Sequence, residues 1–210
     1  CTTMSNEELL KMYEAIKADP GELVRAAARK RLINFARYMQ PDLVLEPFHV
    51  VYYTLLDMFA HGKIRKMIVQ QPPQHGKSEG SSRKLPAFML GLDPDRKICI
   101  GSYAATIARD FNRDVQRIID TPRYRELFPG TYLNGSNVVT MANTYLRNSD
   151  VIEMVGRKGS LRVVGRGGSL TSKTVDVSIL DDVYKDYAEG NSPIVRAAAW
   201  KWYTTVVRTR

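Results

Sequence analysis

Residues 66–78 read KMIVQQPPQHGKS, and this stretch indicates the class of fold. It opens with a short apolar run typical of a strand, and residues 78–90 that follow have the pattern of a helix. Between them, two prolines and Gly76 form a loop that ends in a lysine and a serine. A loop in this position points backbone N–H groups and the positive end of a helix dipole at phosphates. The stretch therefore predicts an α/β fold with a phosphate-binding loop.

The residue types of the loop match distinct roles in nucleotide binding. We expect Lys77 to lie between the β- and γ-phosphates and the Ser78 hydroxyl to bind Mg²⁺. The residues expected to contact the nucleotide from this loop are Gln74, His75, Gly76, Lys77 and Ser78. The full motif begins with glycine, whereas this chain has Gln71. Two alternatives stay open: the loop is only a tight turn with Lys77 in solvent, and His75 faces water.

Strands and helices alternate after the loop. The predicted strands are residues 66–70, 97–103 and 175–180, and the predicted helices are residues 78–90, residues 106–119 and one that opens at Ser192. Such alternation favours a parallel central sheet flanked by helices. Residues 151–155 and 160–164 flank a four-residue turn, which predicts a hairpin that decorates this sheet. Cys99 lies in an apolar run and is expected in the core.

An acidic pair, Asp181-Asp182, ends the last predicted strand. Asp181 is the candidate ligand for Mg²⁺, and Asp182 is the candidate that orients and deprotonates an attacking water. The second acid is often glutamate in ATPases, so the Asp182 carboxylate is about one methylene shorter in reach. The alternative is that two turn-forming aspartates simply cap a strand.

Phosphoryl transfer also requires a cation at the γ-phosphate. The candidates are Arg109, Arg113 and Arg166. We favour Arg166 because it lies in the glycine-rich segment 165–169, ahead of the acidic strand; contact with DNA phosphates or solvent is the alternative. Arg157 and Lys158 at the hairpin tip are either solvated turn residues or a contact for DNA.

The first part of the chain is expected to be helical. Apolar residues recur at helical spacing over residues 5–39, with a break at residues 19–21, which predicts two helices. A third helix is expected over residues 48–62. We divide the chain into a helical lead-in, residues 1–46, and an α/β domain, residues 47–210.

Composition bounds the class of protein. The 31 lysines and arginines exceed the 22 aspartates and glutamates, which gives a net charge of +9 and favours a polyanionic partner. No apolar stretch approaches the roughly 20 residues that span a bilayer, and there is no secretory signal, so we expect a soluble intracellular protein. The three histidines are too dispersed for a metal motif.

Together these motifs resemble the ATPase domain of the large subunit of tailed-bacteriophage terminases, the motors that package viral DNA. The resemblance is carried by residues 72–79, 101–103, 124–129, 165–169, 179–182, 185–186 and 202–210. It implies a P-loop NTPase fold of the ASCE (RecA-like) class over residues 47–210, with ATP and Mg²⁺ as cofactors. In that family the loop lacks its first glycine, and arginine often stands where this chain has Gln74.

The resemblance also implies partners and a location. These are double-stranded DNA, the portal protein of the procapsid, the terminase small subunit and further copies of the chain in a ring, in the cytoplasm of a host bacterium and without a membrane. It implies that His49 contacts the adenine base, although a partly buried histidine at a helix start is the alternative. Because the family carries a nuclease domain further on, we expect the chain to be a fragment that hydrolyses ATP poorly alone.

Two other functions stay open at this stage. A helicase-like nucleic-acid-dependent ATPase has the same phosphate loop and acidic strand. A DNA-binding or assembly module with a degenerate nucleotide site is suggested by Gln71, Gln74 and the short Asp182.

Overall fold

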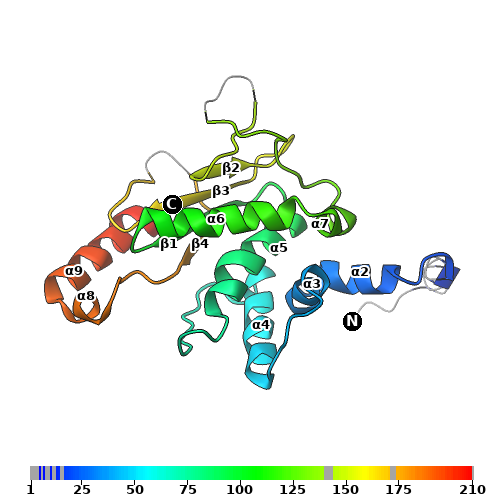
Figure 1. Ribbon diagram of the computed structural model, residues 1–210, viewed down its shortest axis with the longest axis horizontal. Coiled ribbons are helices and arrows are strands. Elements are labelled where there is room, and N and C mark those ends of the chain that lie inside the picture. Colours follow the sequence, from blue (N-terminus) through cyan, green and yellow to red (C-terminus); the bar gives the residue numbers. More distant parts are fainter. Residues whose placement is uncertain are drawn as a thin grey trace.

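The computed structural model describes residues 5, 7, 10, 13–14, 17–139, 144–170 and 174–209. These residues form a mixed α/β fold in which helices flank a four-stranded sheet (Figure 1). The strands are β1 (Lys97–Ser102), β2 (Val151–Glu153), β3 (Ser160–Gly165) and β4 (Val177–Leu180). Their order is β2-β3-β1-β4; β1 pairs in parallel with β3 and β4, and β2 pairs antiparallel with β3. The predicted α/β fold is confirmed, and the carboxyl ends of β1, β3 and β4 share one edge of the sheet.

The sheet differs from the expected one in two strands. The hairpin does not decorate the sheet, because β3 is inserted beside β1, with Leu161 opposite Ile98 and fully buried. Strand β4 lies at an edge among the described strands, although an apolar run such as Val177–Leu180 is typical of a central strand. Both differences concern which strands become neighbours, and an apolar pattern does not encode neighbours.

The strand expected over residues 66–70 is absent, since the extended segment before the loop pairs with no described strand. Its alternating pattern is nevertheless visible in its burial. Met67 and Val69 pack against the main core, whereas Ile68 is 91% exposed. The segment therefore has the side-chain pattern of a strand without a partner to complete its backbone hydrogen bonds.

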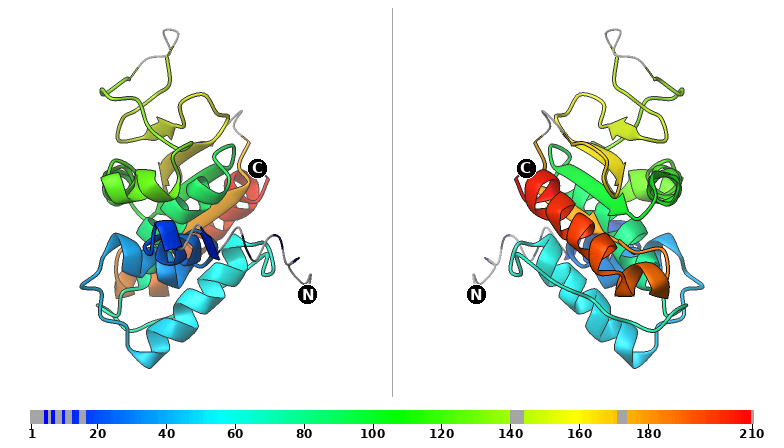
Figure 2. Two further views of the ribbon diagram at one scale, coloured as in Figure 1. Left: turned by 90° about the vertical axis from the view of Figure 1, so that its right-hand side faces the viewer. Right: turned by 90° about the vertical axis from the view of Figure 1, so that its left-hand side faces the viewer.

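Helices cover both faces of the sheet (Figure 2). The helical elements from the middle of the chain onward are α4 (Pro47–Ala60), η1 (Glu79–Lys84), α5 (Leu85–Leu92), α6 (Ala105–Ile119), α7 (Pro122–Leu127), α8 (Tyr187–Asn191), α9 (Pro193–Trp202) and η2 (Tyr203–Val207). Ile98 and Ile100 point into the main core beneath α5 and α6, whereas Cys99 points to the other face, where Trp202 packs. The helices predicted near residues 48–62, 78–90, 106–119 and after Ser192 are thus confirmed, with a π-helical turn, η1, after the loop. Cys99 is confirmed as a core residue, and burial raises the pKa of its thiol to about 12.

The lead-in contains α2 (Glu22–Lys30) and α3 (Leu32–Met39), which replace the single helix expected after the break at residues 19–21. Arg31 between them has extended backbone. The cause is a tertiary contact: the Leu32 N–H donates to the Asp57 carboxylate at 2.7 Å, and Arg31 Nε lies 3.0 Å from the other oxygen of that carboxylate. Phe35 of α3 is fully buried in the same core as α4. The helix expected over residues 5–18 lies largely outside the described residues.

Within the described ranges, we find no helix that combines the length and apolar character needed to cross a bilayer.

Candidate active site

The phosphate loop and the acidic pair meet at the carboxyl-end edge of the sheet. Lys77 Nζ lies 3.0 Å from Asp181 Oδ1 and 2.6 Å from Asp182 Oδ1. The acidic pair extends the pairing of β4 with β1, because the Asp181 N–H donates to Gly101 and the Asp182 carbonyl accepts from Tyr103. The structure thus brings together three residues that the sequence singled out for phosphate, metal and water.

The two carboxylates of the pair have different environments. The Asp181 side chain is 3% exposed and the Asp182 side chain is 59% exposed. Burial opposes ionisation of Asp181, but hydrogen bonds from Ser78 and Ser82 and the charge of Lys77 outweigh it and hold its pKa below the ordinary value. Asp181 is therefore a fixed anion, as a metal ligand must be, while Asp182 is open to water.

Lys77 is held as a cation by the same contacts. Partial burial works against its charge, but the hydrogen bonds to Asp182 and Asp181 dominate in sum and raise the pKa of its ammonium group. Tyr52 of α4 fixes the backbone here by donating from its hydroxyl to the Lys77 carbonyl at 2.5 Å. Burial raises the pKa of Tyr52 to about 12, so the phenol keeps the proton that it donates.

The backbone of the loop forms a tight turn. Gln74 and Gly76 both have positive φ, at 63° and 75°. A Cβ at Gly76 would lie 3.4 Å from Nε2 of His49, so glycine suits both the conformation and the close approach of α4. Asp182, at the facing strand end, also has positive φ, at 47°. Strained backbone on both sides of one contact is typical of functional sites.

Aromatic and imidazole rings line the loop on the α4 side. His49 Nδ1 accepts from the Glu46 N–H at 3.0 Å and helps cap α4, and its Nε2 faces Gly76. The Phe48 and His75 rings lie 5.6 Å apart, and His75 Nδ1 bonds the Pro73 carbonyl at 2.8 Å. His49 and His75, both predicted to contact nucleotide, thus lie on one side of the loop. His49 is a partly buried histidine at a helix start, as the alternative had it, and its contact with the adenine base stays a prediction.

Two observations bear on whether ATP and Mg²⁺ suit this site. Gln71 Oε1 is buried without a hydrogen-bond partner in the described structure, at the base of the loop. The Ser78 side chain helps to lower the pKa of Asp181, which indicates that a hydroxyl and a carboxylate oxygen are near each other. Mg²⁺ typically takes one or two protein oxygens and completes its shell with phosphates and water, and the described residues contain no larger cluster of metal-ligating side chains. The donor set therefore fits a metal bound together with phosphates.

The candidate arginines are engaged elsewhere. Arg166 donates to the Val183 carbonyl and to Glu189 Oε2, both at 2.9 Å, so its guanidinium lies near the acidic pair but faces α8. Arg109 pairs with Asp150 and Arg113 with Asp110, each at 2.7 Å. None of the three contacts Lys77 or the acidic pair in the described structure. Of the three, Arg166 bonds nearest to the acidic pair, because its partner Val183 directly follows Asp182 in the sequence.

Two residues of the site were missed from the sequence. Ser82 donates to Asp181 Oδ2 at 2.7 Å; its position four residues after Ser78, on one helix face, was a signal for it. Tyr52 had no such signal, because nothing in the α4 pattern separates a residue that supports the loop from an ordinary core tyrosine.

No protein-family model, no curated protein and no solved structure matches this chain. Its geometry places a cation, a buried carboxylate and an exposed carboxylate at the mouth of a glycine-containing turn. This arrangement can hold a phosphate and a divalent cation side by side, and Asp182 can handle a proton once its ion pair with Lys77 opens.

Proposed function

We propose that this chain is a P-loop ATPase, the motor domain of a DNA-packaging enzyme of the terminase large-subunit type. It hydrolyses ATP and uses the energy to move double-stranded DNA into a procapsid. The observation that carries the proposal is the contact of Lys77 with Asp181 and Asp182. Lys77 and Asp182 are 105 positions apart in the sequence. The loop and the acidic pair were predicted from separate sequence patterns. Their contact in the structure therefore supports a single site that contains both.

Each residue of the site has a role in hydrolysis. ATP with Mg²⁺ supplies the transferable γ-phosphoryl group and a counter-charge for it. Lys77 Nζ binds phosphate oxygens, while the Ser78 hydroxyl and the Asp181 carboxylate hold the ion. Asp182, 59% exposed, takes the proton of the attacking water. For this step its ion pair with Lys77 has to open, so phosphate binding and activation of Asp182 are coupled.

The parts of the proposal beyond hydrolysis rest on the resemblance of the motifs. They are the duplex DNA substrate, the portal and small-subunit partners, a ring of copies and action in the cytoplasm of a host bacterium. The surplus of positive charge supports a polyanionic substrate. Arg166 is our candidate for the γ-phosphate cation, and it reaches that position only if its bond to Glu189 is exchanged.

ATP turnover, measured with and without duplex DNA, tests the proposal. Lys77→Ala and Asp182→Asn should each lower turnover by on the order of 100-fold, as expected when a group that stabilises the transition state is removed. Asp110→Asn, on the exposed face of α6, is the matched control and should leave turnover unchanged. Normal turnover by Lys77→Ala contradicts the assignment.

The same assay separates the alternatives. Stimulation by single-stranded but not by duplex DNA supports the helicase-like ATPase. ATP binding without turnover under every condition supports the module with a degenerate nucleotide site.

A further inference from the structure

A second charged site lies at the opposite edge of the sheet. A cavity of about 350 Å³ opens where β1 and β3 begin and where the β2–β3 hairpin turns. Lys97 and Ser160 are the first residues of their strands and are paired in register, whereas Asp181 follows the last residue of β4. Six residues of β1 separate the two edges, on the order of 17 Å. The cavity is thus distinct from the candidate active site.

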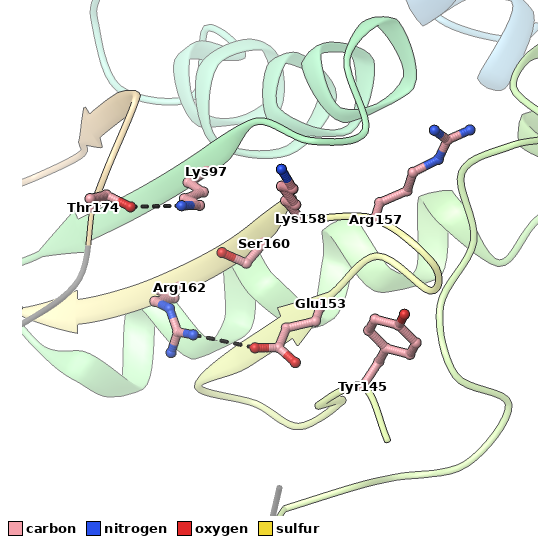
Figure 3. Close-up of a pocket in the computed structure, with 9 residues that line it drawn as sticks. Lys97, Tyr145, Glu153, Arg157, Lys158, Ser160, Arg162 and Thr174 are labelled. Carbon is pink, nitrogen blue, oxygen red and sulfur yellow. Dashed lines mark hydrogen bonds and ion pairs between the residues drawn. The ribbon is translucent and has the colours of Figure 1, made fainter. Parts of the chain in front are cut away.

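Positive side chains dominate the lining of this cavity (Figure 3). Lys97, Arg157, Lys158 and Arg162 line it, together with one carboxylate, that of Glu153. Arg162 Nη2 lies 3.4 Å from Glu153 Oε1, and both side chains are about one-fifth exposed. This pair is an internally neutral wall of the cavity. The remaining three cations give the site its charge.

These three cations have no carboxylate partner in the described structure. Lys97 Nζ donates to the Thr174 hydroxyl at 2.8 Å, which leaves its charge uncompensated. Arg157 and Lys158 are exposed at the hairpin tip, and the Arg157 guanidinium lies beside Gly130, because a Cβ added there would be 3.6 Å from its Nη2. Most described arginines, by contrast, are in ion pairs, as Arg109 and Arg113 are.

The nearby carboxylates do not neutralise the cluster. Asp95 accepts from the backbone N–H of Lys158 and Asp176 from the backbone N–H of Lys97, each at 2.8 Å. Both hold the backbone of the edge in place, and neither forms an ion pair with Lys97, Arg157 or Lys158 in the described structure. With four lysines and arginines against the carboxylates of Asp95, Glu153 and Asp176, the edge keeps a net charge of +1.

The shape of the cluster distinguishes between possible anions. A small ligand is usually enclosed by apolar walls, whereas this cavity is open and lined mainly by charged and polar side chains. Its cations extend from the first residue of β1 out to an exposed hairpin tip. Such a spread matches successive phosphates of a polymer lying across the edge, and guanidinium and ammonium groups are the usual partners of backbone phosphates.

We propose that the amino-end edge of the sheet binds the phosphate backbone of a nucleic acid through Lys97, Arg157 and Lys158. The Tyr145 hydroxyl, on the same cavity wall, is a further donor for phosphate or sugar. The choice of duplex DNA as the probe rests on the proposed function. The cluster itself was identified without reference to the nucleotide site.

The test is the salt dependence of binding to a fluorescein-labelled DNA duplex, measured by anisotropy without nucleotide. Each phosphate contact that is lost lowers the slope of log affinity against log salt by roughly one. Arg157→Ala/Lys158→Ala should therefore make the slope shallower by about two. Arg157→Lys/Lys158→Arg keeps both charges and should restore the original slope.

The matched control is Arg113→Ala/Arg117→Ala, which removes the same charge from the exposed face of α6. It should leave the slope unchanged. The proposal is overturned if the hairpin variant keeps the original slope or if the control variant loses as much. It is also overturned if labelled poly-glutamate binds as tightly as DNA and loses affinity in the hairpin variant, because the partner is then an acidic protein segment.

This outcome is independent of the proposed hydrolysis. Lys77→Ala tests the nucleotide site through ATP, and the hairpin variants test the opposite edge through DNA in the absence of ATP. If Lys77→Ala leaves ATP turnover unchanged, the DNA-binding measurement still tests the amino-end edge. If the hairpin variants bind DNA as wild type does, the ATP assay still tests the nucleotide site.

Discussion

The two edges of the sheet differ in whether their cations are paired with carboxylates. At the carboxyl-end edge, Lys77 is matched by the carboxylates of Asp181 and Asp182. At the amino-end edge, Arg157 and Lys158 have no such partners among the described residues. A cluster of one cation and two carboxylates suits a ligand that brings both a cation and an anion, such as a metal-bound nucleotide. Cations without carboxylate partners suit an external polyanion, so we propose that the two edges of the sheet bind different ligands.

The largest effect on stability is expected at the amino-end edge, for a substitution that places a side chain against the backbone. A Cβ at Gly159 would lie 2.1 Å from the Pro94 carbonyl oxygen, a backbone atom that cannot turn aside. Gly159→Ala should therefore lower the free energy of unfolding by about 3 kcal/mol, the upper end of the usual cost of overpacking. Chemical denaturation measures this.

The control for that variant is Gly190→Ala in α8, where an added Cβ meets nothing within 4 Å. It should be neutral or slightly stabilising, since alanine favours a helix. Equal loss in the two variants would mean that the hairpin does not approach the chain at Pro94 as described.

At the carboxyl-end edge, Asp181→Asn should cost about 1–2 kcal/mol at neutral pH, because it removes the charge that Lys77, Ser78 and Ser82 stabilise. The folded pKa of Asp181 is lowered, so its contribution is present above the ordinary carboxyl pKa of about 3.9 and is lost as pH falls through the lower folded value. The stability difference between wild type and variant should therefore shrink below about pH 4. Unfolding titrations across this range check it, and a difference that stays constant would contradict it.

The smallest effect is expected for an exposed ion pair that belongs to neither edge cluster. Arg109 and Asp150 are 38% and 51% exposed, so Arg109→Ala should leave stability nearly unchanged. Turnover should also be unchanged, because Arg109 contacts neither Lys77 nor the acidic pair. A large fall in turnover would move the γ-phosphate cation from Arg166 to Arg109.

The sequence predicted those helices and strands whose formation depends on the pattern of their own residues. The helix α6 and the strand β1 follow from the periodicity of their own residues, and the meeting of Lys77 with Asp181 was anticipated from loop and strand-end chemistry. The break at Arg31 was not predictable, because it depends on a carboxylate 26 positions away in the chain, that of Asp57.

Pairing of strands was the least predictable feature. Residues 66–70 have the alternation of a strand, yet a strand assignment also requires a neighbouring backbone. Likewise β3 was expected outside the main sheet, because its pairing in parallel with β1 is a tertiary event with no signature in residues 160–165. For the same reason the amino-end cluster was not assembled from the sequence, where Lys97 and Arg157 are 60 positions apart.

The most direct test of the central claim is a calorimetric titration of Mg²⁺-ATP into wild type, Lys77→Ala and the control Arg117→Ala. Lys77→Ala should weaken binding by roughly 10- to 100-fold, the value of a charge-assisted contact of about 1.5–3 kcal/mol, while Arg117→Ala should bind as wild type does. Equal affinity in wild type and Lys77→Ala would contradict a nucleotide site at the carboxyl-end edge.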